Sequence, residues 1–255
     1  TGFGVLDDKM NGLNKSDLII LGARPGMGKT AFAMNIAVTA AKRTKKAVCV
    51  FSLEMSAEQL VTRLLSSEGM VDSYHLRSGE LDEEEWSKIA NAASAMAETD
   101  ILIDDTTGIT VSGMKAKLRR VKNLGLIVID YLQLMQSEKK TDNRVNEVAD
   151  ISRSLKLMAK EFGVPVICCA QLSRGPEKRD DKRPQLSDLR DSGAIEQDAD
   201  SVMLLYRSDY YDMDNPVSEA EVIIAKNRHG SVGRVKLGWY GKYTKFRGYE
   251  ENRQE

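Results

Sequence analysis

The sequence predicts an α/β fold with a mostly parallel sheet flanked by helices. Short apolar runs alternate with amphipathic helical stretches through the first two thirds of the chain, and this alternation is typical of a covered parallel sheet. A loop rich in small residues joins the first apolar run to a helical stretch, as in the phosphate-binding loops of such sheets. The 255 residues suffice for one large α/β domain, although the length alone would allow two. We therefore expect a single domain over residues 1–255.

The apolar runs give the expected strands. Those in the first two thirds of the chain lie at 18–21, 47–51, 101–103, 126–129 and 164–170. Beyond residue 200, further runs separated by turn residues predict hairpin-like strands that extend the sheet. These lie at 201–206, 221–226, 232–239 and 243–247.

Helix signals fill the intervals between the first runs. Ser56 and Asp82 each open a helix as the first residue of a capping box. A third helix is predicted over about 145–162, with apolar side chains on one face, and Gly163 ends it. Residues 171–185 are polar, basic and interrupted by glycine and proline, which is typical of a long mobile loop.

The composition limits the classes of function. The 37 basic and 38 acidic side chains leave a net charge of −1, so any nucleic-acid contact must rest on local basic patches. Cys49, Cys168 and Cys169 lie in apolar runs without metal-ligand spacing, which indicates reduced core residues of a cytoplasmic protein. No apolar run reaches transmembrane length, so we expect no membrane association. The chain opens on Thr1 rather than methionine, which predicts a fragment of a longer protein.

The run from Ala23 to Thr30 is the most informative feature of the chain. It stands between an apolar run and a helical stretch, the layout of a P-loop. Backbone N–H groups and the helix N-terminus cradle phosphate oxygens, Lys29 reaches the β- and γ-phosphates, and the Thr30 hydroxyl ligates Mg²⁺. Ala23 replaces the usual first glycine, and its small side chain changes this little. The predicted nucleotide-binding residues are Arg24, Pro25, Gly26, Met27, Gly28, Lys29, Thr30 and Ala31.

Polar residues follow several other apolar runs. Because ligands bind outside the C-terminal ends of parallel strands, Glu54, Asp130 and Gln171 are expected to join the P-loop in one site. Asp130 fits a carboxylate that holds Mg²⁺, although Asp104 and Asp105 make the same local pattern. Glu54 is expected to orient or deprotonate the attacking water, or else to be a surface glutamate before a helix. Gln171 is expected to sense the γ-phosphate, or else simply to begin the loop.

Two downstream segments have the chemistry of binding to a nucleic-acid backbone. The loop that begins at Gln171 holds the basic residues Arg174, Lys178 and Arg179, although such a mixed charge run is often only a solvated loop. The second segment combines an arginine with backbone N–H groups beside a glycine, which suits phosphates rather than base edges. It holds Arg190, Asp191 and Gly193.

A pair of cations, Lys226 and Arg228, closes a predicted strand. Residues two apart on a strand share a face, so both side chains point the same way. They are expected to reach into a neighbouring subunit's site in the manner of an arginine finger. A charged hairpin tip is the alternative interpretation of the same pattern.

A series of motifs follows in order along essentially the whole chain. Its members are Thr1-Gly2-Phe3 with Leu6-Asp7, Ala23-Arg24-Pro25, Phe51–Ser56, Ile129–Leu134, Gln171–Arg174 and Ser192–Asp200. Together they resemble the motor domain of DnaB-like replicative helicases. The resemblance implies a RecA-like fold, six-membered rings and 5′→3′ movement on single-stranded DNA, driven by hydrolysis of ATP or another NTP with Mg²⁺. It also implies a primase and a helicase loader as partners, through an N-terminal collar domain that is absent here.

The resemblance implies a role for each matched residue. Glu54 is the catalytic base and Gln171 is the γ-phosphate sensor. Asp130, rather than Asp104 or Asp105, is the Walker B carboxylate. Arg228 is the finger supplied in trans, with Lys226 beside it. The loop that tracks DNA in the central channel matches Arg190, Asp191 and Gly193, with Asp191 standing where the family has glutamate.

Two other classes share the P-loop. A RecA-like recombinase or clock-type ATPase would bind DNA or protein without unwinding. A small-molecule kinase would carry an acceptor pocket and lid arginines within one chain. The basic loop linked to Gln171 and the distant cation pair favour a translocase or a recombinase-like ATPase over a kinase.

Overall fold

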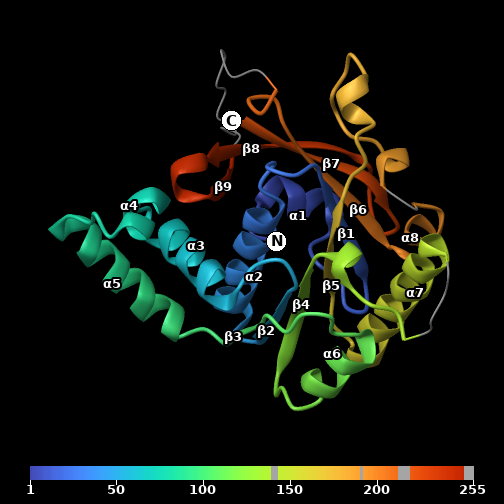
Figure 1. Ribbon diagram of the computed structural model, residues 1–255, viewed down its shortest axis with the longest axis horizontal. Coiled ribbons are helices and arrows are strands. Elements are labelled where there is room, and N and C mark those ends of the chain that lie inside the picture. Colours follow the sequence, from blue (N-terminus) through green and yellow to red (C-terminus); the bar gives the residue numbers. More distant parts are fainter. Residues whose placement is uncertain (139–142, 190–191, 212–218, 250–255) are drawn as a thin grey trace.

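The computed structural model describes residues 1–138, 143–189, 192–211 and 219–249. In this part of the chain one nine-stranded sheet has the order β3-β2-β4-β5-β1-β6-β7-β8-β9 (Figure 1). Strands β1 to β6 run parallel, and β7, β8 and β9 are antiparallel. Each predicted strand is present, with these bounds: β1 Leu18–Ala23, β2 Ala47–Ser52, β3 Ile101–Asp104, β4 Leu124–Asp130, β5 Val166–Gln171, β6 Ser201–Arg207, β7 Glu219–Asn227, β8 Gly233–Tyr240 and β9 Lys245–Gly248.

Strand β6 pairs differently from the expectation. It lies parallel to β1, with Ile19 opposite Ser201, instead of opening the set of terminal hairpins. The reason is the long connection after β5, which carries helix α8 (Ser192–Asp198) and crosses back over the sheet. The antiparallel set therefore begins one strand later, at β7.

Helices cover both faces of the sheet. Phe32 and Leu60 belong to a core cluster on one face, while Met114, Leu155 and Ile195 belong to a cluster on the other. The helices that pack on the sheet and outside it are α1 Gly4–Met10, α2 Lys29–Thr44, α3 Ala57–Gly69, α4 Ser73–Ser78, α5 Glu83–Ala97, α6 Val111–Leu118, α7 Arg144–Phe162 and α8. Helices α4 and α5 lie beyond α3, at the edge of the molecule (Figure 1). None of the helices in the described ranges has the length and apolarity needed to cross a bilayer.

The two cores explain the continuous apolar runs of the sequence. Along β1, Ile19 and Leu21 enter one core cluster, while Leu18 and Ile20 enter the other. Successive side chains of a strand point to opposite faces, so a strand covered on both sides must be apolar at every position. Every residue of β1 is accordingly buried.

The predicted starts of α3 and α5 and the predicted end of α7 are confirmed. The Ser56 side chain accepts a hydrogen bond from the Gln59 N–H, and Asp82 caps α5 in the same way. Helix α7 ends at Gly163, which adopts the left-handed conformation with φ of 64°.

Residues 171–185, predicted to form a long mobile loop, include a 3₁₀ turn and ion-paired arginines in the described structure. The 3₁₀ turn η2 (Pro176–Lys178) lies within the segment, and a second one, η3 (Leu186–Asp188), directly follows it. Its arginines pair with carboxylates: Arg179 with Asp188 at 2.6 Å and Arg183 with Glu221 at 2.6 Å. Glu221 belongs to β7, far along the chain, so sequence spacing gave no sign of the pairing.

A buried ion pair joins α7 to the end of α8. The Lys156 ammonium lies 2.5 Å from the Asp200 carboxylate, which also accepts the Leu18 N–H at 2.8 Å. The Asp200 side chain is 5% exposed, so removing its partner leaves a buried charge. We expect Lys156→Met to lower the free energy of unfolding by about 3 kcal/mol, measured by urea denaturation. Lys88→Met, which breaks an exposed pair with Glu84, is the control, and equal effects of the two would contradict the prediction.

Candidate functional site

The P-loop crosses the C-terminal end of β1 and leads into α2. Gly26 and Gly28 have φ of 79° and 90°, which side-chain-bearing residues rarely adopt. A Cβ at Gly26 would also lie 2.7 Å from the ring of Tyr210. The turn leaves the first backbone N–H groups of α2 facing a large cavity, and these are the donors that bind phosphate at a helix N-terminus.

The cavity has a volume of about 950 Å³ and holds most of the predicted nucleotide-binding residues. Its P-loop wall consists of Ala23, Arg24, Pro25, Gly26, Gly28, Lys29, Thr30 and Ala31. Met27 is the exception, because its side chain is 1% exposed within the core. Met27 can therefore offer only its backbone to a ligand.

Asp130, the last residue of β4, contacts two residues of this wall. Its Oδ2 accepts the Thr30 hydroxyl at 2.5 Å, and its Oδ1 lies 3.1 Å from the Lys29 ammonium. Oδ1 is buried and accepts no hydrogen bond of regular geometry from the described residues. A hydroxyl and a carboxylate with a spare oxygen are ligands that Mg²⁺ prefers, so these residues fit the ion that the family would bring.

Lys29 is held in its charged form. Burial disfavours the ammonium, but the neighbouring Cys169, Asp130 and Glu54 outweigh burial and raise the pKa of Lys29. We attribute the rise to the two carboxylates, because burial raises the pKa of the Cys169 thiol well above its usual range and keeps that thiol neutral. The ammonium also lies 4.0 Å from the centre of the Tyr131 ring. It is thus charged and poised over the site before any phosphate arrives.

The order of the strands explains why Asp130, and not Asp104 or Asp105, lies beside the P-loop. Strand β4 lies between β2 and β5 inside the sheet, whereas β3 forms the edge. Asp104 binds the Lys117 ammonium at 2.5 Å, and Asp105 accepts the N–H of Ala57 at the start of α3. Both carboxylates therefore have partners outside the P-loop. Asp130 is the carboxylate that the fold brings to Lys29 and Thr30.

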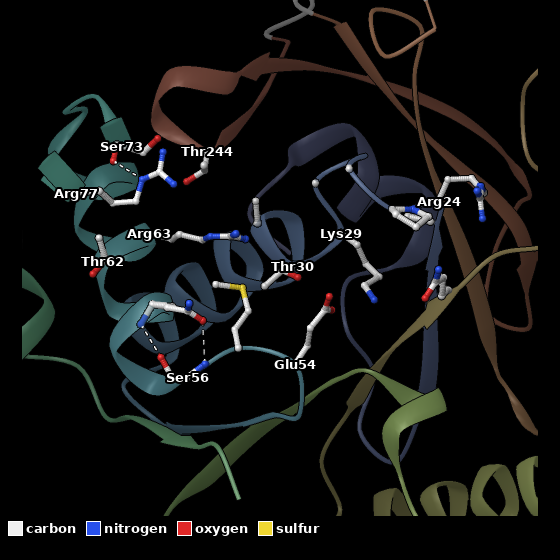
Figure 2. Close-up of a pocket in the computed structure, with 18 of the residues that line it drawn as sticks. Arg24, Lys29, Thr30, Glu54, Ser56, Thr62, Arg63, Ser73, Arg77 and Thr244 are labelled. Atoms are coloured by element: carbon white, nitrogen blue, oxygen red, sulfur yellow. Dashed lines mark hydrogen bonds between the residues drawn. The ribbon is translucent and has the colours of Figure 1, made fainter. Parts of the chain in front are cut away.

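Glu54 and Gln171 line the same cavity as the P-loop. The Leu53 N–H donates to the Asp130 carbonyl at 2.7 Å, which fixes the end of β2 against the end of β4. Glu54 follows this anchor, and Figure 2 shows its carboxylate pointing into the space between Thr30 and Lys29. The convergence of strand ends that the sequence predicted is confirmed.

Gln133, which the sequence analysis missed, holds the backbone of Gln171. Its side chain lies in η1 (Leu132–Leu134), accepts the Gln171 N–H at 3.1 Å and donates to the Gln171 carbonyl at 3.1 Å. These two bonds fix the end of β5 beside β4. The Gln171 side chain is left to face the cavity.

The far wall of the cavity comes from residues that carried no sequence signal. Helices α3 and α4 and the strand pair β8–β9 supply Gln59, Thr62, Arg63, Ser73, Arg77, Trp239 and Thr244. Figure 2 shows Arg63 extending from α3 into the cavity. The guanidinium of Arg207 stacks on Trp239 at 4.6 Å and donates to the Gly26 carbonyl at 3.2 Å. Only the sheet order brings these late strands next to the P-loop.

Comparison with known proteins decides the family. The profile described as "DnaB-like helicase C terminal domain" matches residues 1–248. The chain belongs to this family. It is 53% identical over 251 residues to "Replicative DNA helicase DnaC" of Bacillus subtilis, covering 96% of this chain and 55% of that protein. It is 48% identical over 261 residues to "Replicative DNA helicase DnaB" of Haemophilus influenzae, covering 100% and 56%.

The DnaB-like chain has the same fold as solved helicase structures. A solved ATPase domain superimposes with a TM-score of 0.93 and 39% identity, covering 98% of this chain and 90% of that one. A DnaB-like replicative helicase, solved in a study of its interactions with primase, gives 0.92 and 38%, covering 98% and 61%. The predicted RecA-like fold is confirmed. The chain spans a little over half the length of the curated relatives it matches.

The residues expected to bind DNA differ in their surroundings in this DnaB-like domain. Arg174 and Lys178 are exposed. Arg179 donates to both oxygens of the buried Asp188 and to the Arg183 carbonyl, so its guanidinium is engaged within the domain. Gly193 lies exposed in α8. The other two predicted residues, Arg190 and Asp191, lie outside the described residues.

Arg24 also differs from a phosphate ligand in its placement. Its guanidinium binds the Glu177 carboxylate at 2.5 Å and the Leu172 carbonyl at 2.9 Å. Figure 2 shows the side chain directed away from Thr30. Arg24 thus ties the P-loop to the basic segment after β5, a contact across more than a hundred residues that spacing cannot reveal.

Lys226 lies in β7, and Arg228 directly follows Asn227, the last residue of that strand. Both donate to backbone carbonyls at the C-terminal end of α8. Lys226 is opposite Val202 near the start of β6, which in turn runs level with the start of β1. The P-loop follows the other end of β1, roughly 13 Å away for four residues of strand. The cation pair therefore lies at the opposite end of the strands from the P-loop of its own chain.

Proposed function

We propose that this chain is the ATP-hydrolysing motor of a replicative DNA helicase that moves 5′→3′ on single-stranded DNA as a hexameric ring. One observation carries the proposal. Lys29, Thr30, Glu54 and Gln171 line one cavity, and Asp130 binds Lys29 and Thr30 beside it. Lys226 and Arg228 lie at the opposite end of the central strands. A site with its cations so placed becomes complete only when a neighbouring subunit supplies them.

The chain's own residues divide the work of hydrolysis. The P-loop backbone and Lys29 hold the phosphates, and Glu54 takes the proton of the attacking water. Gln171 contacts the γ-phosphate. Thr30 and Asp130 would hold Mg²⁺, which neutralises the charge that develops on the phosphates. Arg228, with Lys226 beside it, would stabilise the transition state in the neighbour's site.

Arg63 serves the nucleoside end of the cavity in this proposal. The phosphates occupy the P-loop wall, so the remainder of the nucleotide extends toward α3 and Trp239. We expect Arg63→Ala to raise the KM for ATP about tenfold, with kcat changed less than about threefold, because it removes binding that is uniform through the reaction. Arg43→Ala, which removes a cation at the far end of α2, is the control. A fall in kcat with unchanged KM would place Arg63 in the chemistry instead.

The partners follow from the family. Single-stranded DNA would contact Arg190, Asp191 and Gly193, with Arg174, Lys178 and Arg179 nearby. Primase and a helicase loader would bind the complete protein, in the cytoplasm of a bacterial cell or phage-infected host. The similarity to a solved DnaB-like helicase described with primase supports primase as a partner.

The test is ATP hydrolysis per subunit against protein concentration, with and without single-stranded DNA. The full-length protein is used beside this chain. Activity per subunit that rises with concentration and with DNA supports sites shared between subunits. A flat profile for the full-length protein, indifferent to DNA, contradicts the proposal. Unwinding of a forked duplex then separates a helicase from a recombinase-like or clock-type ATPase, which would hydrolyse ATP without unwinding.

A further inference from the structure

The nucleotide cavity has further cations on the wall away from the P-loop. The described residues that line the cavity include the arginines Arg24, Arg63 and Arg77. The Arg24 guanidinium is paired with Glu177. Arg63 and Arg77 are exposed, and neither pairs with a carboxylate of the described residues. Within that part of the chain, two positive charges therefore face the cavity without a counter-ion.

Hydroxyl groups surround the second of these cations. Within α4 the Nε of Arg77 donates to the Ser73 carbonyl at 3.2 Å, which leaves the two terminal nitrogens of the guanidinium for a ligand. Helix α4 packs against the turn η4 (Gly241–Tyr243), and Thr244 follows that turn. Figure 2 shows Ser73, Arg77 and Thr244 at the side of the cavity away from Lys29. Guanidinium and hydroxyl groups are donors that bind phosphate oxygens.

Arg63 extends this positive region toward the P-loop. Figure 2 shows its side chain reaching from α3 into the space between Thr30 and Arg77. The carboxylate of α3 that lines the cavity is Glu58, in the first turn of the helix. Five residues separate it from Arg63, which is about 7.5 Å along the helix axis. The far wall therefore offers positive charge at Arg63 and Arg77, as the P-loop does at Lys29.

We propose that the group around Arg77 is a second phosphate-binding subsite, whose ligand is a nucleotide with a further phosphate group on its ribose. The inference rests on the proposed function, because it takes the 5′-phosphates to lie on the P-loop. The ribose then lies in the remaining space, and the phosphate that it carries meets Arg63 and Arg77. The cavity volume of about 950 Å³ is at the upper end of the range of about 300–1,000 Å³ for small-molecule sites, which suits a ligand with phosphates at both ends.

Such a ligand inhibits the motor when its 5′ end carries only two phosphates. It fills the P-loop but offers no γ-phosphate to Glu54 and Gln171, so it occupies the site without being hydrolysed. The second subsite thus lets the site bind a nucleotide other than its substrate tightly enough to compete with ATP.

The test compares two nucleotides that differ only in the phosphates on the ribose. Guanosine 3′,5′-bis(diphosphate) and GDP each displace a fluorescent ATP analogue from the full-length protein, at a fixed concentration of free Mg²⁺. We expect the bis(diphosphate) to bind at least about tenfold more tightly than GDP, because its 3′-phosphates make charge-assisted hydrogen bonds to the arginines. Equal dissociation constants for the two nucleotides overturn the inference.

Variants of Arg77 locate the added phosphates. In Arg77→Ala the preference for the bis(diphosphate) over GDP should fall below about threefold, because a charge-assisted hydrogen bond is lost. In Arg77→Glu the bis(diphosphate) should bind more weakly than GDP, because like charges repel. Arg43→Ala removes an exposed cation at the far end of α2 and should keep the full preference. A preference that survives in Arg77→Ala would place the added phosphates elsewhere and overturn the inference.

The proposed function fails separately from this inference. A full-length protein that binds neither the ATP analogue nor GDP removes the proposed function itself. A protein that binds both, without preference for the bis(diphosphate), keeps its P-loop site and loses only the second subsite.

Discussion

Replacing Arg228 with alanine is expected to abolish DNA-stimulated ATP hydrolysis while nucleotide binding stays nearly intact. Arg228 lies at the end of the sheet away from its own P-loop, so its loss leaves the cavity of its own chain complete. A trans-acting arginine typically contributes a factor of about 10³–10⁵ to kcat. The measurement pairs steady-state hydrolysis on single-stranded DNA with binding of a fluorescent ATP analogue.

Mixing subunits makes this prediction sharper. Lys29→Ala subunits lack a working P-loop but keep Arg228, and Arg228→Ala subunits have the reverse defect. Rings that mix the two contain interfaces with both an intact P-loop and an intact arginine, so hydrolysis should return in the mixture. Arg234→Ala, which removes an exposed cation of β8, is the control and should keep full activity. Equal loss of binding and turnover in Arg228→Ala would place this arginine in its own subunit's site.

Replacing Glu54 with glutamine is the second large effect. We expect kcat for ATP to fall about 10²–10⁴-fold, the usual contribution of a general base, while the affinity for nucleotide changes little. The amide keeps the size and hydrogen-bonding capacity of the side chain but cannot accept a proton. Glu54 is the carboxylate that points between Thr30 and Lys29, where the attacking water would stand (Figure 2).

The matched control for Glu54 is Glu58→Gln, a carboxylate on the α3 wall of the same cavity. It removes the same charge at a place away from Lys29. Rapid-mixing measurements should show that Glu54→Gln binds ATP and DNA but does not cleave the γ-phosphate. A variant that hydrolyses ATP at the rate of Glu58→Gln would reduce Glu54 to the surface glutamate before a helix that its sequence context also allowed.

Elements with local causes could be predicted from the order of residues alone. The P-loop is one of them, because a strand, a turn with left-handed glycines and a helix N-terminus are contiguous in the chain. Capping boxes and the helix end at Gly163 are equally local, since their hydrogen bonds join residues within a turn or two. Runs of apolar residues marked the strands because both faces of the sheet are covered.

Which of these elements meet depends on the folded sheet. Asp130 and Asp104 follow similar apolar runs, and strand order alone puts the first beside Lys29 and the second at the sheet edge. The sequence predicted that Arg179 binds DNA, but in the folded domain its guanidinium pairs with Asp188. Arg63 and Trp239 joined the nucleotide cavity without any motif.

Lys226 and Arg228 show most clearly which features depend on local spacing and which depend on long-range strand pairing. Spacing predicted that Lys226 and Arg228 point the same way, and both side chains do reach carbonyls at the end of α8. It could not determine which end of the strands they reach, or that the carbonyls at the end of α8 would accept their hydrogen bonds. Those facts depend on the direction and register of β6 and β7, which long-range pairing sets and no local run of residues encodes.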